Sequence, residues 1–496
     1  MVAYVILFLR FKDMKLLFVL INFVELMEVL ANIFSISIFV FAVFIMSSYL
    51  ILALISIYTL RDYLWSNNFI DYNVLLSSEH APSLSLIAPA YNEGKTIEEN
   101  IQSLLSLNYS NYEVIIVNDG SKDDSMEKMI NAYQLEIDSN FKFTAYLKTK
   151  EIKGIYKSKN PAFKKLVVID KMNGGKSDAL NVGINISCNP YVVCIDVDCI
   201  IEKDALLKMA KPFMENHKGR VIATGGVVRI ANSCKVSNGR LIEVNVPEPF
   251  LPRIQVIEYM RAFLLGRMAW AKMDGLLLIS GAFGMFDKEI AILCGGYDHS
   301  TVGEDMELVM RMRRYMVETG QKYTVPFVPD PLCWTEAPDN FTILGKQRSR
   351  WTRGTMESLW SHRVMAFNPK FKSLGVLSYP YWLVFEYCAP LIEFFGFIIT
   401  ILFFVFGFIN LNFFILLLLF VYSFAVMIST LALLTEEYTF HQYPKIKDYF
   451  KLLLVAIIEP FYFHPFVVYS AIKGNWEKIK GVKSWGEMTR GGFTKK

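Results

Sequence analysis

Two apolar regions near opposite ends of the chain limit its possible folds more than any other feature. Residues 33–60 contain no charged side chain, and a helix that rises about 1.5 Å per residue over such a length crosses a hydrocarbon layer of about 30 Å. A second region holds two apolar runs, 379–409 and 411–434, which meet at Asn410 and predict a hairpin of two spans. Because 53% of the 496 residues are hydrophobic and many are concentrated in these runs, the sequence predicts an α-helical transmembrane bundle.

The remaining apolar segments are less regular. Residues 1–30 mix charged and apolar side chains, so this stretch is either an interfacial helix or an extra span, and we expect an interfacial helix. Residues 450–472 contain Pro460 and Pro465, and the basic segment 473–496 favours the cytoplasmic side. A third full crossing would place that basic tail outside the cell, so we expect 450–472 to be a broken or re-entrant segment.

Between residues 61 and 373 the composition changes to that of a protein that folds in water. Short apolar strands alternate with charged helices, the pattern typical of a parallel sheet in an α/β, Rossmann-like domain. Strands are expected at residues 84–89, 113–117, 166–170 and 191–195, and helices at 97–107, 254–270 and 306–318. The resulting regions are an N-terminal membrane anchor (1–62), the α/β domain (80–345), amphipathic interface helices (346–375), a C-terminal membrane region (376–472) and a basic tail (473–496).

The cysteines and the net charge restrict the compartment and the partners. The seven cysteines show neither the spacing of a zinc site nor an even, paired framework, so we expect reduced thiols in the core and a cytoplasmic α/β domain. A net charge of +4 is too small to indicate a nucleic acid as partner.

Polar loops follow the first two expected strands, at the edge of the sheet where α/β proteins bind ligands. One loop contains Tyr91, Asn92 and Glu93, and the other contains Asp119 followed by Gly120. Each loop alone is also typical of an ordinary turn or helix entry. Two such loops at one edge favour a binding site.

A third loop carries Gly174, Gly175 and Lys176 at the start of a helix. Backbone amides beside glycines, the positive end of the helix and the Lys176 ammonium group together suit a diphosphate. These residues do not have the spacing of a Walker loop, so an ATPase is not indicated. The alternative is a glycine turn with Ser177 as the helix N-cap.

Two carboxylates, Asp196 and Asp198, stand at the end of the expected strand 191–195. Residues two apart in an extended segment point the same way, so both carboxylates leave the sheet edge on one side. Hard oxygen ligands in this arrangement suit Mg²⁺ or Mn²⁺ shared with substrate phosphates. The alternative is a pair of solvated carboxylates without a ligand.

A further acidic pair, Glu304 and Asp305, follows Gly303 at the start of an expected helix. Acidic residues in a first helical turn also interact favourably with the helix dipole, which is a purely structural explanation. The functional explanation is a general base that takes a proton from an acceptor hydroxyl. The residues themselves do not decide between Glu304 and Asp305.

An amide, a guanidinium and an indole share one helical face at Gln347, Arg350 and Trp351, immediately before the second membrane region. Indole stacks on the apolar face of a sugar ring, and the polar groups suit hydroxyls or a diphosphate. The alternative is an interfacial tryptophan beside arginine on an amphipathic helix.

In this order, the motifs resemble those of the membrane-bound processive glycosyltransferases of family 2, which include cellulose, hyaluronan, chitin and poly-N-acetylglucosamine synthases. The resemblance covers most of the chain and implies a GT-A-like fold for the α/β domain. Gly303 is a departure, because many relatives have threonine there.

The resemblance also implies roles for single residues. It assigns Pro89, Tyr91, Asn92, Glu93 and Asp119 to the uridine, Lys176 and Asp196 to the diphosphate, and Asp198 together with Asp196 to the metal ion. It assigns Asp305 to the catalytic base with Glu304 beside it, Gly281 to a small-residue loop beneath the acceptor, and Gln347, Arg350 and Trp351 to the diphosphate and acceptor.

The basic tail contains Trp485, Thr489 and Arg490, which resemble the gating segment of hyaluronan and chitin synthases with two residues inserted. The alternative is a basic aromatic segment that lies on the membrane surface.

The resemblance, together with these features, implies an inverting, processive transferase in the plasma (inner) membrane. We expect it to polymerise a β-linked polysaccharide from a UDP-sugar, with UDP-N-acetylglucosamine favoured over donors for cellulose-like or hyaluronan-like products. Its expected partners are the UDP-sugar, the growing polysaccharide, the lipid bilayer and an accessory export subunit. The alternatives are a non-processive membrane glycosyltransferase and a non-catalytic export component.

Overall fold

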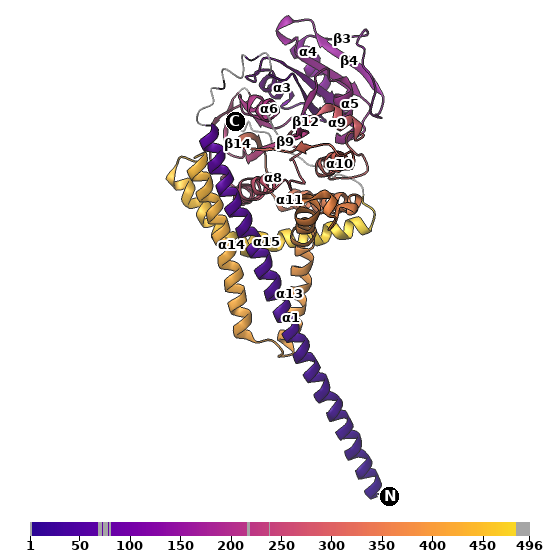
Figure 1. The fold of residues 1–496 in the computed structure, drawn as a ribbon, viewed down its shortest axis with the longest axis vertical. Coiled ribbons are helices and arrows are strands. Elements are labelled where there is room, and N and C mark those ends of the chain that lie inside the picture. The colour runs from indigo at the N-terminus through magenta and orange to yellow at the C-terminus, as the bar shows by residue number, and fades with distance from the viewer. Residues whose placement is uncertain are drawn as a thin grey trace.

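The computed structural model describes residues 2–67, 72, 78, 81–215, 219–237 and 239–482. Figure 1 shows a mixed α/β domain at one end and long helices that extend away from it. The strands are β1 Leu84–Ala90, β2 Tyr112–Asn118, β3 Leu135–Ile137, β4 Ile152–Ser158, β5 Leu166–Lys171, β6 Tyr191–Ile195, β7 Ile200–Ile201, β8 Arg220–Val221, β9 Ala223–Ile230, β10 Lys235–Ser237, β11 Arg240–Glu243, β12 Phe283–Asp287, β13 Tyr323–Thr324 and β14 Phe327–Thr335.

Helices cover the sheet, and the long apolar helices α1, α13 and α14 form a stalk that extends away from it (Figure 1). The α-helices are α1 Val2–Asn67, α3 Ile97–Leu105, α4 Ser125–Tyr133, α5 Lys176–Ile186, α6 Ala205–Met214, α7 Phe250–Met260, α8 Met268–Lys272, α9 Lys288–Leu293, α10 Glu304–Glu318, α11 Phe341–Ser361, α12 Tyr379–Tyr381, α13 Ala389–Val405, α14 Leu411–Thr439 and α15 Ile446–Ile479. Short 3-10 helices lie at η1 Pro161–Phe163, η3 Arg363–Met365 and η4 Pro369–Phe371, and π-helical turns at η2 Arg261–Arg267, η5 Leu374–Ser378 and η6 Trp382–Tyr387.

A ten-stranded sheet with the order β3-β4-β5-β2-β1-β6-β12-β9-β14-β7 organises the α/β domain. Strands β5, β2, β1 and β6 run parallel, and β12 joins β6 in the antiparallel direction. The apolar side chains of β1, β2 and β6 are almost all buried, as expected for strands covered on both faces. The sheet therefore has a parallel centre, and the carboxyl ends of four neighbouring strands meet at one edge.

The predicted strands and helices are present, with small differences at their ends. Strand β1 ends at Ala90 instead of residue 89, and α3 ends at Leu105 instead of residue 107. Helix α10 begins at Glu304, two residues before the prediction, because Gly303 is its N-cap and the two carboxylates occupy its first turn. The predicted helix 254–270 comprises α7, the π turn η2 and α8.

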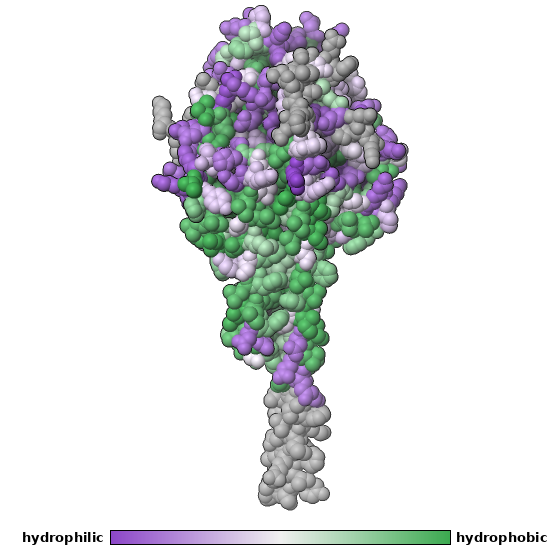
Figure 2. All heavy atoms as spheres, turned by 60° about the vertical axis from the view of Figure 1, so that its left-hand side comes forward, coloured by the Kyte–Doolittle hydropathy of each residue, from purple (hydrophilic) through white to green (hydrophobic). Residues whose placement is uncertain are grey.

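Long apolar helices form the stalk below the α/β domain. Among the described residues, three helices are long and apolar enough to cross a membrane, or up to four if the bent pair around Cys388 counts as one span. Figure 2 shows hydrophobic side chains gathered around the stalk and hydrophilic ones over the α/β domain. Exposed apolar residues of the stalk include Phe39, Phe44, Phe397, Leu416 and Leu419.

The N-terminal region differs from the prediction. Residues 2–67 form one uninterrupted helix, α1, whereas we expected a separate interfacial helix over residues 1–30. The sequence contains neither proline nor glycine in this range, so no residue favours a break in the helix.

The run 379–409, predicted as one span, is bent. The segments Leu374–Tyr387 and Ala389–Val405 meet at an angle of 40°. Pro390 lies in the first turn of α13, where the missing N–H is tolerated and a new helix begins. The turn after α13 is as predicted: Asn410 caps α14, and its side chain accepts a hydrogen bond from the Phe413 amide (3.1 Å).

The last apolar segment is an unbroken helix, which corrects the predicted break within residues 450–472. Helix α15 continues through Pro460 and Pro465, and it packs against α7, α11, α13 and α14. Figure 1 shows α15 running crosswise beneath the α/β domain, whereas α1, α13 and α14 follow the long axis. Packing on several sides holds the helix together where its prolines remove backbone hydrogen bonds.

All seven cysteines lie in described parts of the chain and have free thiols. Cys194, Cys199, Cys234 and Cys333 are buried, as expected. Cys188 is exposed, so the expectation that all of the thiols lie in the core is wrong for this residue.

Candidate active site

Four motif residues meet where α5, α10 and the loop before β12 approach the end of β6. Lys176, the first residue of α5, places Nζ 2.5 Å from Asp196 Oδ1 and 3.9 Å from Glu304 Oε1. The same Nζ donates a hydrogen bond to the Gly281 carbonyl (3.3 Å). Burial alone would lower the pKa of Lys176, but the neighbouring carboxylates raise it. The ammonium group is therefore held in its charged form among three acidic side chains.

Asp305 is held in place by backbone amides. Its Oδ2 accepts a hydrogen bond from the Gly281 amide (3.0 Å), and its Oδ1 accepts one from the Met306 amide (2.9 Å). A Cβ at Gly281 would lie 3.3 Å from both Asp305 Oδ2 and Lys176 Nζ, which is closer than ordinary contacts. The backbone of Gly281 thus links Asp305, the expected base, to Lys176, which is expected to bind the diphosphate. A side chain at this position would crowd both residues.

Glu304 is buried beside Asp305, with only 3% of its surface exposed. Burial, aided by the neighbouring Asp305 carboxylate, raises the pKa of Glu304, while the cations of Lys176 and Arg350 oppose the rise; the resulting pKa is about 7. The two neighbouring carboxyl groups therefore have different environments, a pattern typical of active sites. Glu304 therefore stays protonated to a higher pH than a free glutamate.

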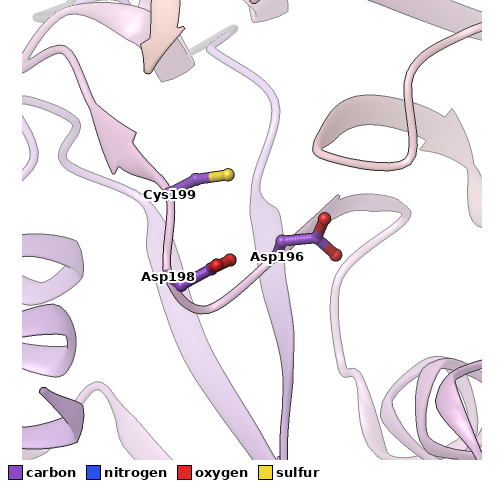
Figure 3. A group of neighbouring side chains, drawn as sticks. All are labelled: Asp196, Asp198 and Cys199. Carbon is purple, nitrogen blue, oxygen red and sulfur yellow. The ribbon is translucent and has the colours of Figure 1, made fainter. Parts of the chain in front are cut away.

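Asp196, Asp198 and Cys199 form a group that fits a cation. One ligand atom from each residue lies within 4.8 Å of the others. Figure 3 shows the three side chains on the loop between β6 and β7. The two carboxylates supply the hard oxygen ligands that Mg²⁺ and Mn²⁺ prefer, while a thiolate suits softer metals. The donor set therefore fits a divalent cation held mainly by the two aspartates.

Asp119 has a different local role from a simple ligand. Its carboxylate pairs with Lys171 (2.5 Å) and accepts hydrogen bonds from the amides of Gly174 (2.9 Å) and Gly175 (2.8 Å). Lys171 is fully buried and also pairs with Asp178 (2.7 Å). Burial raises the pKa of Asp119, although Lys171 and the two amides act in the opposite direction. This network fixes the glycine loop that leads into Lys176.

Sequence reasoning did not identify Lys171 or Asp178. Lys171 ends a buried strand, β5, and Asp178 lies in the first turn of α5. A lysine at the end of an otherwise apolar strand is a usable signal, because such a residue needs a buried partner.

The loop after β1 joins the loop after β2. Asn92 adopts a left-handed conformation (φ 58°). Its backbone N–H donates a hydrogen bond to Ser121 Oγ (2.9 Å), and its side-chain oxygen accepts one from the backbone N–H of Lys122 (2.8 Å). Tyr91 is exposed, with Pro89 in the strand before it and Glu93 in the loop after it. The structure thus brings together the two loops that the sequence places at one edge of the sheet.

Helix α11 carries Gln347, Arg350 and Trp351 at the expected spacing. Arg350 lies within electrostatic range of Glu304, so this residue brings α11 near the acidic pair. Trp351 is 39% exposed, and Gln347 Oε1 is shielded from solvent without a hydrogen-bond partner in the described part of the chain. An exposed indole beside a shielded polar atom offers contacts to a ligand.

Arg348, which sequence reasoning passed over, supports Trp351. Its guanidinium lies 4.3 Å from the Trp351 ring centre and makes two hydrogen bonds to Glu258 of α7 (2.6 and 2.7 Å). The bidentate pair orients the guanidinium plane against the indole. Glu258 therefore positions α11 rather than taking part in chemistry.

Gly303 and the basic tail are the remaining residues that the sequence singles out. Gly303 contacts α11 directly, since a Cβ there would lie 2.6 Å from the Gly354 Cα. Trp485, Thr489 and Arg490 lie outside the described residues.

The assembled groups are suited to a metal-dependent reaction of an anionic substrate. Lys176 offers positive charge, and two aspartates offer oxygen ligands that would hold a divalent cation. The Gly174 and Gly175 amides, expected to suit a diphosphate, donate to the Asp119 carboxylate instead. Asp305 presents a carboxylate nearby that the Gly281 and Met306 amides hold in place. Such an arrangement is suited to displacing a diphosphate while a carboxylate accepts a proton.

Comparison with known proteins finds poly-N-acetylglucosamine synthases among the relatives. The poly-beta-1,6-N-acetyl-D-glucosamine synthase of Staphylococcus epidermidis is 28% identical over 308 residues, 62% of this chain and 63% of the relative. The synthase of the same name from Staphylococcus aureus (strain COL) is 28% identical over 317 residues, 63% of this chain and 64% of the relative. The chain thus spans less than two thirds of the length of these curated relatives.

A solved structure, a mannosyltransferase of Pyrobaculum calidifontis in complex with GDP-Man and Mn²⁺, is 14% identical with a TM-score of 0.47. That match covers 88% of this chain and 99% of the mannosyltransferase.

A family model described as "Glycosyltransferase like family 2" matches residues 81–354, which is more than half of the chain. With the mixed sheet, this match confirms the expected α/β, GT-A-like fold, here joined to apolar helices. The chain belongs to glycosyltransferase family 2.

Proposed function

We propose that this protein transfers sugars from a UDP-sugar to the end of a growing β-linked polysaccharide, with UDP-N-acetylglucosamine as the donor. The observation that carries the proposal is the Gly281 backbone, which joins Lys176 and Asp305 through hydrogen bonds of 3.3 and 3.0 Å. A diphosphate ligand and a proton acceptor thus lie on either side of one residue. The choice of sugar is supported by the relatives, which are named as poly-N-acetylglucosamine synthases.

The donor site is formed by loops at the carboxyl ends of β1, β2, β5 and β6. The loop containing Tyr91 and Asn92 holds the uridine, and Asp119 shapes the adjoining glycine loop. Lys176 pairs with the diphosphate. Asp196 and Asp198 would hold Mg²⁺ or Mn²⁺, and the bound ion would stabilise charge on the departing diphosphate.

Asp305 is the proposed general base. An acceptor hydroxyl gives its proton to the Asp305 carboxylate as the hydroxyl oxygen bonds to the anomeric carbon of the donor, and the bond from that carbon to the diphosphate breaks. Attack opposite the leaving group inverts the anomeric centre. The Gly281 and Met306 amides orient the carboxylate and do not take the proton.

Helix α11 forms the acceptor side. The exposed Trp351 ring supplies a flat surface for a sugar, and Arg348 holds that ring from behind. Arg350, within electrostatic range of Glu304, and Gln347, whose Oε1 is shielded without a hydrogen-bond partner in the described part of the chain, contribute polar contacts. A stacking surface that accepts successive sugar rings is compatible with repeated additions to one polymer.

Export through the membrane is the finer part of the proposal. Ionisable groups are rare in membrane helices and mark transport pathways when present. In the stalk, Glu386 lies 3.4 Å from the Tyr49 hydroxyl, and His464 lies 2.6 Å from Glu393. We assign these polar groups to the path of the polymer. The α/β domain then lies on the cytoplasmic side of the plasma (inner) membrane. An accessory export subunit assists export, and the tail around Trp485 has a gating role.

The proposal is tested with purified protein in detergent. UDP-N-acetylglucosamine, UDP-glucose and UDP-glucuronate are supplied singly and in pairs with Mn²⁺, and both UDP release and product size are measured. Polymer from UDP-N-acetylglucosamine alone supports the proposal. Turnover of another donor would overturn the sugar assignment, and single-sugar products or no turnover would overturn the polymerase assignment.

A further inference from the structure

The end of α15 makes an ion pair with α11 close to the acidic motif. Lys478 Nζ lies 2.5 Å from Oε1 of Glu357, and the Glu357 side chain is only 13% exposed. Partial burial of both groups reduces screening by solvent, so this pair is stronger than an exposed one.

The other oxygen of Glu357 holds the loop that precedes α10. Glu357 Oε2 accepts hydrogen bonds from the Thr301 hydroxyl (2.8 Å) and the Val302 amide (2.9 Å). Thr301 Oγ1 in turn accepts one from the Gly303 amide (3.0 Å). One carboxylate therefore fixes three consecutive residues that lead directly into Glu304 and Asp305.

Further contacts fix the register of α15 on α11. A Cβ at Gly474 would lie 2.7 Å from the Ser349 carbonyl oxygen, so the two backbones are in close contact. Ser349 donates a hydrogen bond to Glu477, and Arg353 donates one to the Val482 carbonyl (2.8 Å). These contacts hold α15 in place along α11, so the position of Lys478 beside Glu357 is fixed.

The electrostatic surroundings keep Glu357 ionised. Burial alone would raise its pKa, but the Lys478 ammonium, the Val302 amide and the Thr301 hydroxyl together lower it. An ionised carboxylate accepts these hydrogen bonds more strongly than a neutral one.

A small displacement at this loop reaches the reacting groups. Gly303 is the N-cap of α10, and Glu304 and Asp305 are the first two helical residues. Reacting groups must be held within about 0.5 Å of a productive geometry, and a misplacement of about 1 Å reduces the rate roughly 100-fold.

We propose that Glu357 is a positioning residue that sets the geometry of Glu304 and Asp305, and that Lys478 anchors it to the last membrane-associated helix. The inference rests on the proposed function, because it assumes that Asp305 acts as base. It assigns α15 a part in catalysis as well as in membrane association: a shift of α15 changes the placement of the catalytic carboxylates.

The test uses the full-length protein in detergent with Glu357→Ala, Glu357→Gln and Lys478→Met. Lys451→Met is the matched control, because it removes another ion pair on α15. Lys451 pairs with Asp448 (3.1 Å), at the other end of the helix from Lys478. UDP release gives kcat and the donor KM, and calorimetry gives UDP affinity. Hydrogen exchange of the peptide containing Val302 reports the loop itself.

We expect Glu357→Ala to lower kcat about 100-fold while the donor KM and UDP affinity change less than about threefold. Glu357→Gln keeps an acceptor for the Val302 amide and should lose about tenfold, as should Lys478→Met. The rate of hydrogen exchange of the peptide containing Val302 should rise in all three variants and stay unchanged in Lys451→Met.

Unchanged kcat in folded Glu357→Ala, or equal changes in the donor KM and kcat, would overturn the inference. The hydrogen-exchange result separates this failure from that of the proposed function. If wild-type protein turns over no donor, the proposed function fails; if it turns over donor and Val302 exchange does not respond to Glu357→Ala, the positioning role fails.

Discussion

Gly303 and Gly354 bring the backbones of α10 and α11 into direct contact. A Cβ on Gly303 would lie 2.6 Å from the Gly354 Cα, and a Cβ on Gly354 would lie 2.7 Å from the Gly303 Cα. The helix that carries the proposed base and the helix that carries Trp351 therefore meet at a point where neither residue can have a side chain. This contact gives a physical reason for glycine at position 303, which the sequence marks only as a departure from relatives.

Substitution Gly354→Ala should separate the two helices and lower activity. The new methyl group meets backbone atoms that cannot rotate away, so we expect a destabilisation of about 1–3 kcal/mol and a loss of turnover larger than the loss of folded protein. Gly345→Ala on the same helix is the control, because its nearest neighbour is the end of the Phe466 ring at 3.3 Å. Thermal unfolding and UDP release of both variants are measured; equal behaviour would contradict the close-contact explanation.

Asp305→Asn should abolish transfer and leave donor binding intact. The Gly281 and Met306 amides donate to different oxygens of the carboxylate, so the single oxygen of asparagine keeps one of these two hydrogen bonds. The asparagine amide cannot take a proton from an acceptor. We expect kcat to fall at least about 100-fold with UDP affinity within about threefold of wild type. Calorimetry with UDP and Mn²⁺ checks binding, and substantial residual turnover would reassign the base.

Removal of the divalent cation with EDTA should stop turnover, and Mn²⁺ should restore it. Asp198→Asn replaces one of two carboxylate ligands, so the Mn²⁺ concentration for half-maximal activity should rise at least about tenfold. Asp138→Asn, which alters a carboxylate paired with Lys157 on the surface, is the control. A Mn²⁺ titration of UDP release distinguishes them, and identical titration curves would remove Asp198 from the metal site.

Stability should respond to pH through Glu304. Burial raises the pKa of Glu304 to about 7 from the ordinary value of 4.5, so the folded state binds the proton more tightly than the unfolded state. Glu304 therefore contributes stability that is complete below about pH 4.5 and is lost as the pH rises through about 7. The Tm of wild type should fall between about pH 5 and about pH 8 by several degrees more than the Tm of Glu304→Gln. Parallel Tm curves would show that Glu304 ionises normally.

The placement of the donor motifs follows from the sequence because parallel strands end at one edge of a sheet. Buried runs of valine and isoleucine in β1, β2, β5 and β6 determine where each polar loop begins. The alternation of strands and helices was thus sufficient to bring Asp119, Lys176 and Asp196 into one region. The helical spacing likewise placed Gln347, Arg350 and Trp351 on α11.

The remaining features depend on contacts between residues far apart in the chain. The pairing of Asp119 with Lys171, of Arg348 with Glu258 and of Glu357 with Lys478 joins different elements, and no local pattern indicates these partners. Continuity of α15 through its two prolines also depends on packing, since local propensity alone favours a break there.

The most direct test of the account is the length of the product at early turnover. Purified protein receives excess UDP-N-acetylglucosamine with Mn²⁺, and product chains are sized when roughly one donor in a hundred has been consumed, with Asp305→Asn alongside. If the synthase is processive, the reaction should already contain long polymer while most acceptor ends remain unextended. The reaction of the variant should contain no polymer. Short products that lengthen together with time, or single-sugar transfer, would contradict the account.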